Sequence, residues 1–258
     1  MNIQNKYGLK FEFLANGCIK SIEDQQIRIN LKSENPFTPT LSNVYLRKRG
    51  TVPVWIPLTG PLSKSEFTIQ NNGYYLRGQW EGLKYSAKLE LSSGSKSWRW
   101  SIFLQNDAGQ DCVADLVLVQ DIGLKAISDN LVNEYYVSQY IERIVLKDPR
   151  QGSVVCCRQN IKEPSGYPWI LIASAGFASC ASTDGMQFFG NKYRSDGVPQ
   201  ALTENLTGDL AGESSIVALQ EEEFILKNGE NKLISFVATF IADHPEATST
   251  KDLTIIRK

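Results

Sequence analysis

Short segments of alternating apolar and polar residues, separated by turn-forming residues, recur along nearly the whole chain of 258 residues. Residues 9–13 alternate, Asn16 and Gly17 can supply the positive φ angles of a tight turn, and residues 18–22 alternate back. Because successive side chains of a strand point to opposite faces, this pattern predicts a β-hairpin with one buried face. The same pattern predicts a third strand at 27–31 and further strands, the last four as an antiparallel meander, at 44–49, 65–70, 74–80, 85–91 and 98–105.

Two segments depart from simple alternation. Residues 112–121 form a long apolar run, which predicts a central strand, and we expect the charge inside it, Asp115, to face outward. In the segment 98–104 the even-numbered residues are all apolar, and only Arg99, Ser101 and Phe103 oppose them. We therefore expect this strand to lie between two layers.

Prolines and small polar residues mark the loops. Residues 33–42 contain two prolines and predict a loop, and three prolines between 53 and 61 confine any strand there to an edge or a bulge. Residues 191–214 are rich in Gly, Asp, Asn and Thr, and we expect at most a short helical turn in them, at 202–210.

The second half of the chain continues the β pattern. We expect strands at 152–157 and 169–182, the latter ending in a Gly- and Ala-rich bend. Residues 216–227 and 232–242 are joined by the turn-forming residues 228–231, which predicts a second hairpin that closes the chain.

The segment 133–141 contains three tyrosines in nine residues, with Asn, Glu, Ser and Gln among them. Leu131, Tyr135, Ile141 and Val145 roughly fit the spacing of a helix, whereas alternation within the segment fits a strand. Enrichment in β-branched and aromatic residues favours the extended conformation. Tyrosine pairs an apolar ring with a hydroxyl, so the segment suits either a sugar-facing surface or a polar seam between two sheets, and composition alone favours the seam.

A dozen or more short strands without a repeat period predict an all-β fold, a large antiparallel β-sandwich rather than a propeller. No linker divides the chain. We expect one sandwich domain at 1–247, with 248–258 as the start of a linker or the end of an excised fragment.

Charge and cysteine usage restrict the partners and the compartment. The chain has 27 Lys and Arg against 28 Asp and Glu, a net charge of -1, which argues against nucleic acid or an anionic membrane as a partner. No apolar run approaches the length of a membrane span, and the N-terminus lacks the apolar core of a secretory signal. The five cysteines have no ligand spacing and are expected to be buried free thiols in a cytoplasmic protein.

Few residues point to chemistry by themselves. The single histidine, His244, follows the last expected strand, so a metal site or a Ser-His-Asp arrangement is not expected, and no phosphate-loop or dinucleotide fingerprint predicts a cofactor. A pair of carboxylates for glycoside chemistry stays open among 28 acids. The 26 aromatic residues are compatible with sugar contact, although the core of a sandwich accounts for most of them.

Four stretches together carry a family resemblance, at 133–141, 157–160, 183–190 and 240–248. In this order they resemble the N-terminal domain of the inverting phosphorylases of glycoside hydrolase family 94. Within that family, β-1,2-oligoglucan phosphorylase and the phosphorylase-like region of cyclic β-1,2-glucan synthase are the most similar.

The resemblance implies a galactose-mutarotase-like β-sandwich that is followed by a helical linker and an (α/α)₆ barrel carrying the catalytic aspartate. It implies that this chain is a non-catalytic domain of an enzyme that cleaves a β-linked glucan with inorganic phosphate to give α-glucose 1-phosphate. The sandwich would shape the active-site rim and contribute to a homodimer. Polar residues inside the matched stretches are the candidates for rim contacts: Gln139, Arg158, Gln159 and Asp184. Each of them has a competing interpretation as a residue that holds loops by structural hydrogen bonds.

Two other functions stay open. A mutarotase-like sugar epimerase would use core histidines and a glutamate, which the position of His244 makes a weak alternative. A stand-alone glucan-binding or assembly module would bind sugar without turnover and act with separately encoded catalytic chains.

Overall fold

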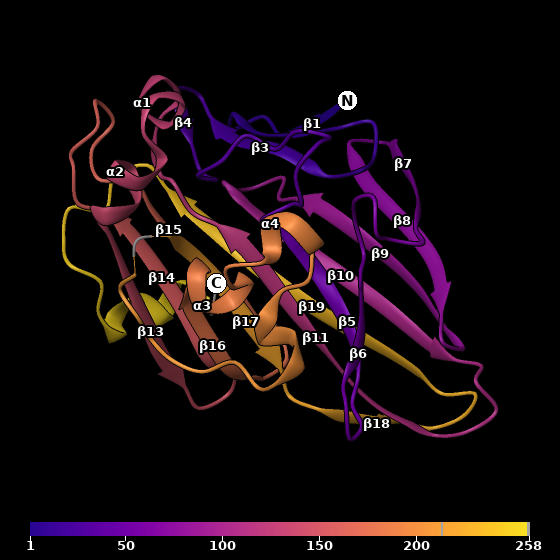
Figure 1. The fold of residues 1–258 in the computed structure, drawn as a ribbon. Helices are drawn as coiled ribbons and strands as arrows, with labels where there is room; N and C mark the ends of the chain where they lie inside the picture. The colour runs from indigo at the N-terminus through magenta and orange to yellow at the C-terminus, as the bar shows by residue number, and fades with distance from the viewer. Residues whose placement is uncertain (213, 257–258) are drawn as a thin grey trace.

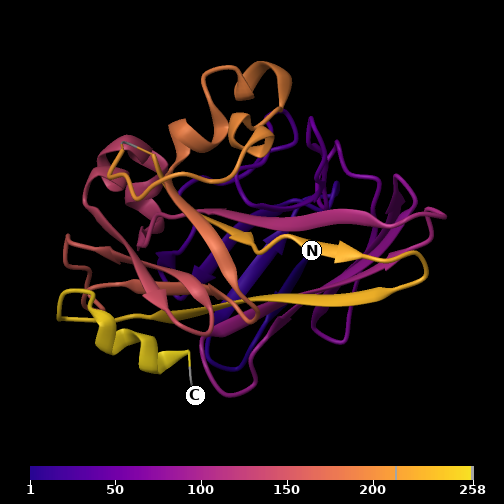
Figure 2. The same ribbon diagram turned by 90° about the horizontal axis from the view of Figure 1, so that it is seen from below.

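The strands form two sheets in the computed structural model, which describes residues 1–212 and 214–256 and all their side chains except those of residues 130–132 (Figure 1). The larger sheet curls back on itself, so that two layers enclose most of the apolar core (Figure 2). The layers meet where β14 and β16 share a single parallel bridge, Gly152 to Ala178. The smaller sheet closes one end of the sandwich.

The front layer has the order β6-β5-β11-β17-β16, and β18 extends it by pairing with β11. These strands are β5 (Asn43–Lys48), β6 (Val54–Pro57), β11 (Cys112–Asp121), β16 (Ala178–Asp184), β17 (Ser215–Glu221) and β18 (Phe224–Leu226). The proline-punctuated β6 lies at the edge, as predicted, because proline cannot donate to a ladder on both sides.

The back layer has the order β13-β14-β15-β19-β10-β9-β8-β7. These strands are β7 (Glu66–Gln70), β8 (Gly73–Trp80), β9 (Leu83–Leu91), β10 (Ser97–Asn106), β13 (Ile141–Asp148), β14 (Gly152–Gln159), β15 (Trp169–Ser174) and β19 (Asn231–Ile241). The antiparallel register from β7 through β10 confirms the predicted meander.

The smaller sheet has the order β1-β2-β3-β4-β12. Its strands are β1 (Asn2–Gln4), β2 (Leu9–Phe13), β3 (Ile19–Asp24), β4 (Ile27–Arg28) and β12 (Lys125–Ala126). The predicted opening hairpin is confirmed by the pairing of β2 with β3, whereas the third strand is shorter than the expected 27–31. Phe13 stacks on Tyr74 of β8 with ring centroids 4.4 Å apart, so this sheet packs on the inner face of the back layer.

Several predictions about strand pairing are wrong. The expected closing hairpin does not form, because β17 pairs with β11 and β16 in the front layer and β19 pairs with β10 and β15 in the back layer. The stretch 169–182 is likewise divided, since β15 and β16 belong to different layers. At 228–231 the turn was identified correctly, whereas the chain reverses at 175–177, inside the strand expected at 169–182. In both places the chain crosses between the layers.

The strand β10 does not lie between two layers. Trp98 and Trp100 are buried on the core face, whereas Arg99 is exposed and Phe103 is 40% exposed on the other. The predicted burial on both faces is therefore wrong, because no other part of the described chain covers this outer face.

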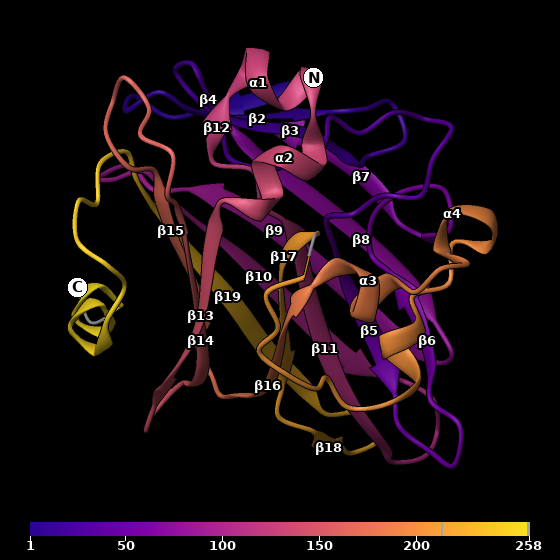
Figure 3. The same ribbon diagram turned by 60° about the vertical axis from the view of Figure 1, so that its left-hand side comes forward.

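The tyrosine segment is helical rather than extended, which corrects the prediction. After α1 (Ile127–Val132), the Asn133 side chain accepts a hydrogen bond from the Tyr136 N–H and caps α2 (Glu134–Gln139). Both helices lie at one end of the sandwich, beside the smaller sheet (Figure 3). Tyr135, Tyr136 and Tyr140 are exposed, so they form no seam between sheets. The side chain of Leu131, part of the helical pattern, lies outside the described residues.

Short helices cover the outer face of the front layer (Figure 2). They are α3 (Gly185–Phe189), α4 (Tyr193–Asp196) and the 3₁₀ helix η1 (Gln200–Thr203), so helical structure begins earlier than the expected 202–210. A second 3₁₀ helix, η2 (Thr250–Ile255), packs Leu253 against β14 and β15 on the outer side of the back layer. The cover thus comes from segments whose composition predicted loops and a linker.

The five cysteines are all free thiols; three are buried, and Cys112 and Cys180 are half-buried. No helix among the described residues is long and apolar enough to cross a membrane.

Candidate functional site

A polar pocket of about 240 Å³ lies between α3 and the segment 200–207, on the outer side of the front layer. The residues that line it are Ser182, Met186, Gln187, Gln200, Ala201, Thr203, Glu204, Asn205, Leu206 and Thr207. Three carboxamides and three hydroxyls supply both donors and acceptors, and Glu204 is the one carboxylate among these described residues. Such a set matches the hydroxyl groups of a neutral polyol or sugar better than it matches an ion.

Ser182 contributes a buried, unpaired hydroxyl to the lining of this pocket among the described residues. It lies in β16 and is 2% exposed, and its hydroxyl has no hydrogen-bond partner among the described residues. Leaving a buried polar group unpaired costs about 1–3 kcal/mol. A ligand hydroxyl that pairs with Ser182 Oγ would recover that free energy.

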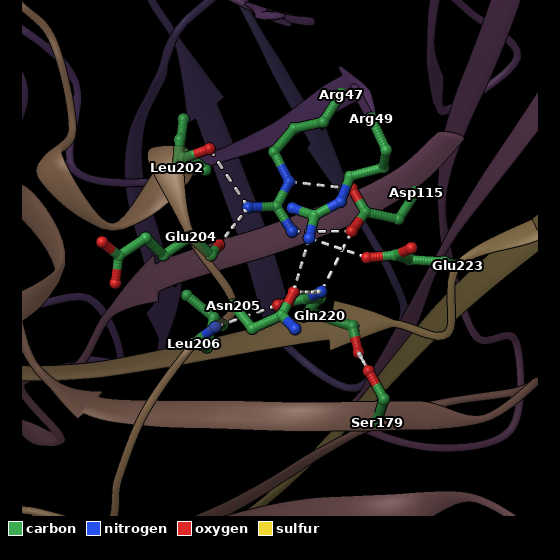
Figure 4. A network of polar contacts seen from close by, with 10 residues as sticks. All are labelled: Arg47, Arg49, Asp115, Ser179, Leu202, Glu204, Asn205, Leu206, Gln220 and Glu223. Atoms are coloured by element: carbon green, nitrogen blue, oxygen red, sulfur yellow. Dashed lines mark hydrogen bonds and ion pairs between the residues drawn. The ribbon is translucent and has the colours of Figure 1, made fainter. Parts of the chain in front are cut away.

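The wall formed by residues 202–206 rests on a buried ion pair (Figure 4). Arg47 on β5 and Asp115 on β11 occupy directly opposed positions in the ladder, and both side chains are 0% exposed. The guanidinium donates to both carboxylate oxygens, from Nε at 2.8 Å and from an Nη at 2.6 Å. Asp115 lies on the outer face of its strand, as expected. It is nevertheless buried rather than exposed to solvent, because the segment 202–206 covers it.

The remaining donors of this network hold the covering segment. Arg47 also donates to the backbone oxygens of Leu202 at 3.2 Å and Glu204 at 2.7 Å. Gln220 of β17 accepts from the Leu206 N–H at 2.9 Å, while its Nε2 donates to Asp115. These contacts satisfy a buried charge pair that would otherwise be costly. They also determine where the wall of the pocket stands.

Asn205 is oriented by the same network. Its Oδ1 accepts from Gln220 Nε2 at 2.9 Å and from an Arg49 guanidinium nitrogen at 2.8 Å, and Arg49 forms an ion pair with Glu223 at 2.7 Å (Figure 4). With Oδ1 occupied by two donors, the amide group of Asn205 has a defined orientation. Its Nδ2 is left to donate to other groups.

The opposite wall is α3, and Asp184 determines its start. The Asp184 carboxylate accepts from the Gln187 N–H at 3.1 Å and caps the helix. Phe188 and Phe189 then pack against the front layer, which leaves Met186 and Gln187 exposed at the pocket. Asp184 is buried and does not line the pocket, so its effect on the site is to position Gln187.

The other predicted rim residues lie elsewhere. Arg158 of β14 donates to the backbone oxygens of His244 at 2.8 Å and Pro245 at 2.9 Å and stacks on Tyr167. Gln159 is fully buried and its Oε1 accepts from the Ile161 N–H. Both therefore make the structural hydrogen bonds that the competing interpretation describes.

Gln139 is exposed at the end of α2. Gln159 Nε2 reaches the Val137 backbone oxygen of that helix at 3.4 Å, so these two predicted residues belong to the same end of the sandwich. Asp184 lies on β16 of the front layer, where its ladder partner Ser215 bonds Ser138 of α2, so one intermediate residue joins it to the same end. None of the four residues lines the pocket beside α3, and their contact with sugar stays a prediction.

Sequence reasoning missed the residues that build the pocket, chiefly Arg47, Asp115, Gln187, Asn205 and Gln220. One signal was available: a carboxylate within an apolar central strand is rarely buried unless it is paired. The identity of its partner was not readable, because Arg47 lies 68 positions away from Asp115 in the sequence.

His244 takes part in a structural contact. Its ring stacks on Trp169 with centroids 4.7 Å apart, and its Nε2 lies 3.0 Å from Asp252 of η2. Among the described residues, no three His, Cys, Asp or Glu side chains come together in a way that could hold a metal ion.

Comparison with known proteins places this geometry in a context. Residues 12–237 match the family described as the SOGP N-terminal domain. The chain is 27% identical over 190 residues to a 1,2-beta-oligoglucan phosphorylase of Listeria innocua serovar 6a. The aligned region covers 73% of this chain and 17% of the relative. The chain thus matches less than a fifth of the length of this curated relative.

Two solved structures show the fold. A putative kojibiose phosphorylase from the human microbiome has a TM-score of 0.52 at 11% identity, over 98% of this chain and 31% of that one. A galactose mutarotase-like protein of Lactobacillus casei has a TM-score of 0.50 at 9% identity, over 93% of this chain and 99% of that one. The predicted all-β, galactose-mutarotase-like sandwich is confirmed.

Proposed function

Because the chain belongs to the SOGP N-terminal domain family, we propose that it is the non-catalytic N-terminal domain of an inverting phosphorylase that acts on β-linked glucans. Inorganic phosphate is the co-substrate, and the product is α-glucose 1-phosphate. In this proposal the catalytic acid belongs to an (α/α)₆ barrel of the same or a partner chain, as in glycoside hydrolase family 94. Homodimer contacts and a cytoplasmic location belong to the same proposal.

One observation carries the proposal: the chain aligns over most of its own length with a small part of a 1,2-beta-oligoglucan phosphorylase. This relation supports the substrate class and the assignment as one domain of a larger assembly. The polar pocket supports it independently, because its amides and hydroxyls suit the hydroxyl groups of a sugar.

The role of this chain is to bind and orient glucan. Gln187 and Asn205 donate to sugar hydroxyls, and Ser182 pairs with a hydroxyl that enters the pocket. Asp184 and Arg47 act through these residues, the first by capping α3 and the second by holding the segment 202–206. Gln139, Arg158 and Gln159 remain proposed rim residues at the end of the sandwich where α2 lies.

The test measures phosphate-dependent release of glucose 1-phosphate from β-1,2-oligoglucans. It compares three samples: this chain alone, the Listeria relative lacking the matched segment, and that relative with this chain in place of the segment. We expect release only from the third sample. Release by this chain alone would contradict the proposal, and sugar binding without restored release in the chimera would favour the stand-alone module.

A further inference from the structure

A second pocket, of about 290 Å³, opens on the other side of the helical cover, next to α4. Its walls come from three segments that are distant in sequence: the loop 36–40, the residues 57–62 that follow β6, and the residues 193–197 of α4 and its C-terminus. It shares no lining residue with the pocket beside α3. The site is therefore separate from the one described above.

The floor of this pocket is held rigidly. Tyr45 and Tyr193 are buried at its base, and the Tyr193 hydroxyl donates to the Thr40 backbone oxygen. The Asn43 side chain bonds both backbone groups of Thr59: its Nδ2 donates to the oxygen at 3.0 Å, and its Oδ1 accepts from the N–H at 3.1 Å. Thr59 thus has a fixed backbone position at the pocket.

Two hydroxyls at the pocket have no hydrogen-bond partner in the part of the chain that the structure describes. Thr59 is 4% exposed, and its Oγ1 is buried without a hydrogen bond among the described residues. The Oγ1 of Thr38, on the facing loop, is also buried without a hydrogen bond among the described residues. Buried hydroxyls are rarely left unpaired, and a ligand that offers hydroxyls can satisfy both.

The rim of the pocket supplies an aromatic surface. Phe37 is 92% exposed, which is unusual for a large apolar side chain, and its backbone N–H is held by Asn35 Oδ1 at 2.9 Å. Across the pocket, α4 presents Arg194 and Asp196, both exposed. An exposed aromatic ring at the rim, two unpaired hydroxyls and a balanced pair of charges match a ligand with an apolar face and several neutral hydroxyl groups.

We propose that this pocket binds one neutral hexose unit, with Phe37 against the C–H face of the ring and Thr38 and Thr59 bonded to its hydroxyls. The volume lies below that of pockets for drug-sized ligands, which fits one sugar ring rather than an oligosaccharide chain. The inference rests on the proposed function only in taking glucose as the hexose.

The test is a two-dimensional amide NMR titration of the whole chain with D-glucose, D-galactose and, as a charged control, glucose 1-phosphate. We expect saturable shifts of the Phe37, Thr38 and Thr59 amides with a neutral hexose at millimolar concentrations. Phe37→Ala, whose side chain is exposed, should fold normally and weaken binding roughly fivefold, the size of one lost ring contact. Thr59→Val, which keeps the shape and removes the hydroxyl, should weaken it by a similar factor.

Phe103→Ala is the matched control, because Phe103 is also an exposed phenylalanine but lies on the outer face of β10. Unchanged affinity in Phe37→Ala, or shifts confined to the pocket beside α3, would overturn the inference. So would the absence of saturable shifts with every neutral hexose. Hexose binding at this pocket together with a chimera that releases no glucose 1-phosphate would contradict the proposed function and still support this binding site.

Discussion

The two outer faces of the sandwich differ in whether other segments of the chain cover their polar side chains. The outer face of the front layer is covered by α3, α4 and η1, and β17 is buried at every position. No described residue outside the sheet covers the outer face of β7 to β10 in the back layer, which has alternating burial along β9 and β10 and an open groove of about 680 Å³. The same sheet thus has one closed and one open surface.

Ion pairs show what this difference means. On the open face, Arg77 pairs with Glu66 at 3.0 Å while both side chains are 78% exposed, so water competes with the contact. On the covered face, Arg47 and Asp115 are fully buried, and each depends on the other and on the segment 202–206. A contact of the same chemistry therefore positions a pocket wall on one face and contributes little on the other.

The largest expected effect comes from breaking the buried pair. Arg47→Met leaves Asp115 charged and unpaired, and we expect the free energy of unfolding to fall by about 3–5 kcal/mol. Arg77→Met on the open face should change it by less than about 1 kcal/mol. Urea denaturation of both variants measures the contrast. If the two substitutions lowered the free energy of unfolding equally, burial under the helical cover would not explain the difference between these ion pairs.

The next effect concerns Glu34, a carboxyl that is 4% exposed in the loop after β4. Burial, with a smaller contribution from Asp121, raises the pKa of Glu34 from its ordinary value of 4.5 to about 8. Between these pH values the folded protein keeps a proton that the unfolded chain releases, so the free energy of unfolding should fall as pH rises from about 4.5 to 8.

Glu34→Gln removes this titration, and the loss of stability across that pH range should shrink by an amount on the order of a few kcal/mol. Thermal unfolding at several pH values measures it, with the exposed Glu66→Gln as control. An unchanged pH profile in Glu34→Gln would show that another group is responsible.

A smaller effect should follow from removing the cap of α3. Asp184→Ala loses the hydrogen bond from the Gln187 N–H and should lower the free energy of unfolding by about 1 kcal/mol. Asp184→Asn keeps an acceptor and should recover most of the loss. Recovery by Asn would support capping as the role of this residue, whereas equal losses in Ala and Asn would point to its charge instead.

The smallest expected effect is on sugar binding at the polar pocket. Gln187→Ala removes one hydrogen-bonding side chain and should weaken β-1,2-oligoglucan binding roughly fivefold, with no change in stability. Gln70→Ala, which removes the same side chain from the groove of the open face, should leave the affinity unchanged. Titration calorimetry distinguishes the two faces, and a loss only in Gln70→Ala would move the binding site to the open one.

Local patterns predicted the elements that depend on local chemistry. The turn at Asn16 and Gly17 gave the opening hairpin, and the prolines placed β6 at an edge. The prediction of a closing hairpin was wrong because turn-forming residues indicate that the chain reverses but do not indicate in which layer the next strand pairs. The prediction of an extended tyrosine segment was wrong, because its β-like composition takes no account of the N-cap that Asn133 supplies.

The site was less predictable because its contacts are long-range. The backbone oxygen of Leu202 is held by Arg47, 155 positions away, and this contact depends on the β5–β11 register. Asp184 was selected from a family-like stretch, and it supports the pocket from behind its wall. The polar composition of 191–214 predicted a loop, but not that this loop covers a sheet.

The most direct test of the account asks which outer face a glucan contacts. Hydrogen exchange of this chain, measured with and without β-1,2-oligoglucan, reads both faces in one experiment. We expect slower exchange within 185–207 and unchanged exchange in β7 to β10. Slower exchange confined to β7 to β10 would contradict this expectation and assign sugar binding to the uncovered face.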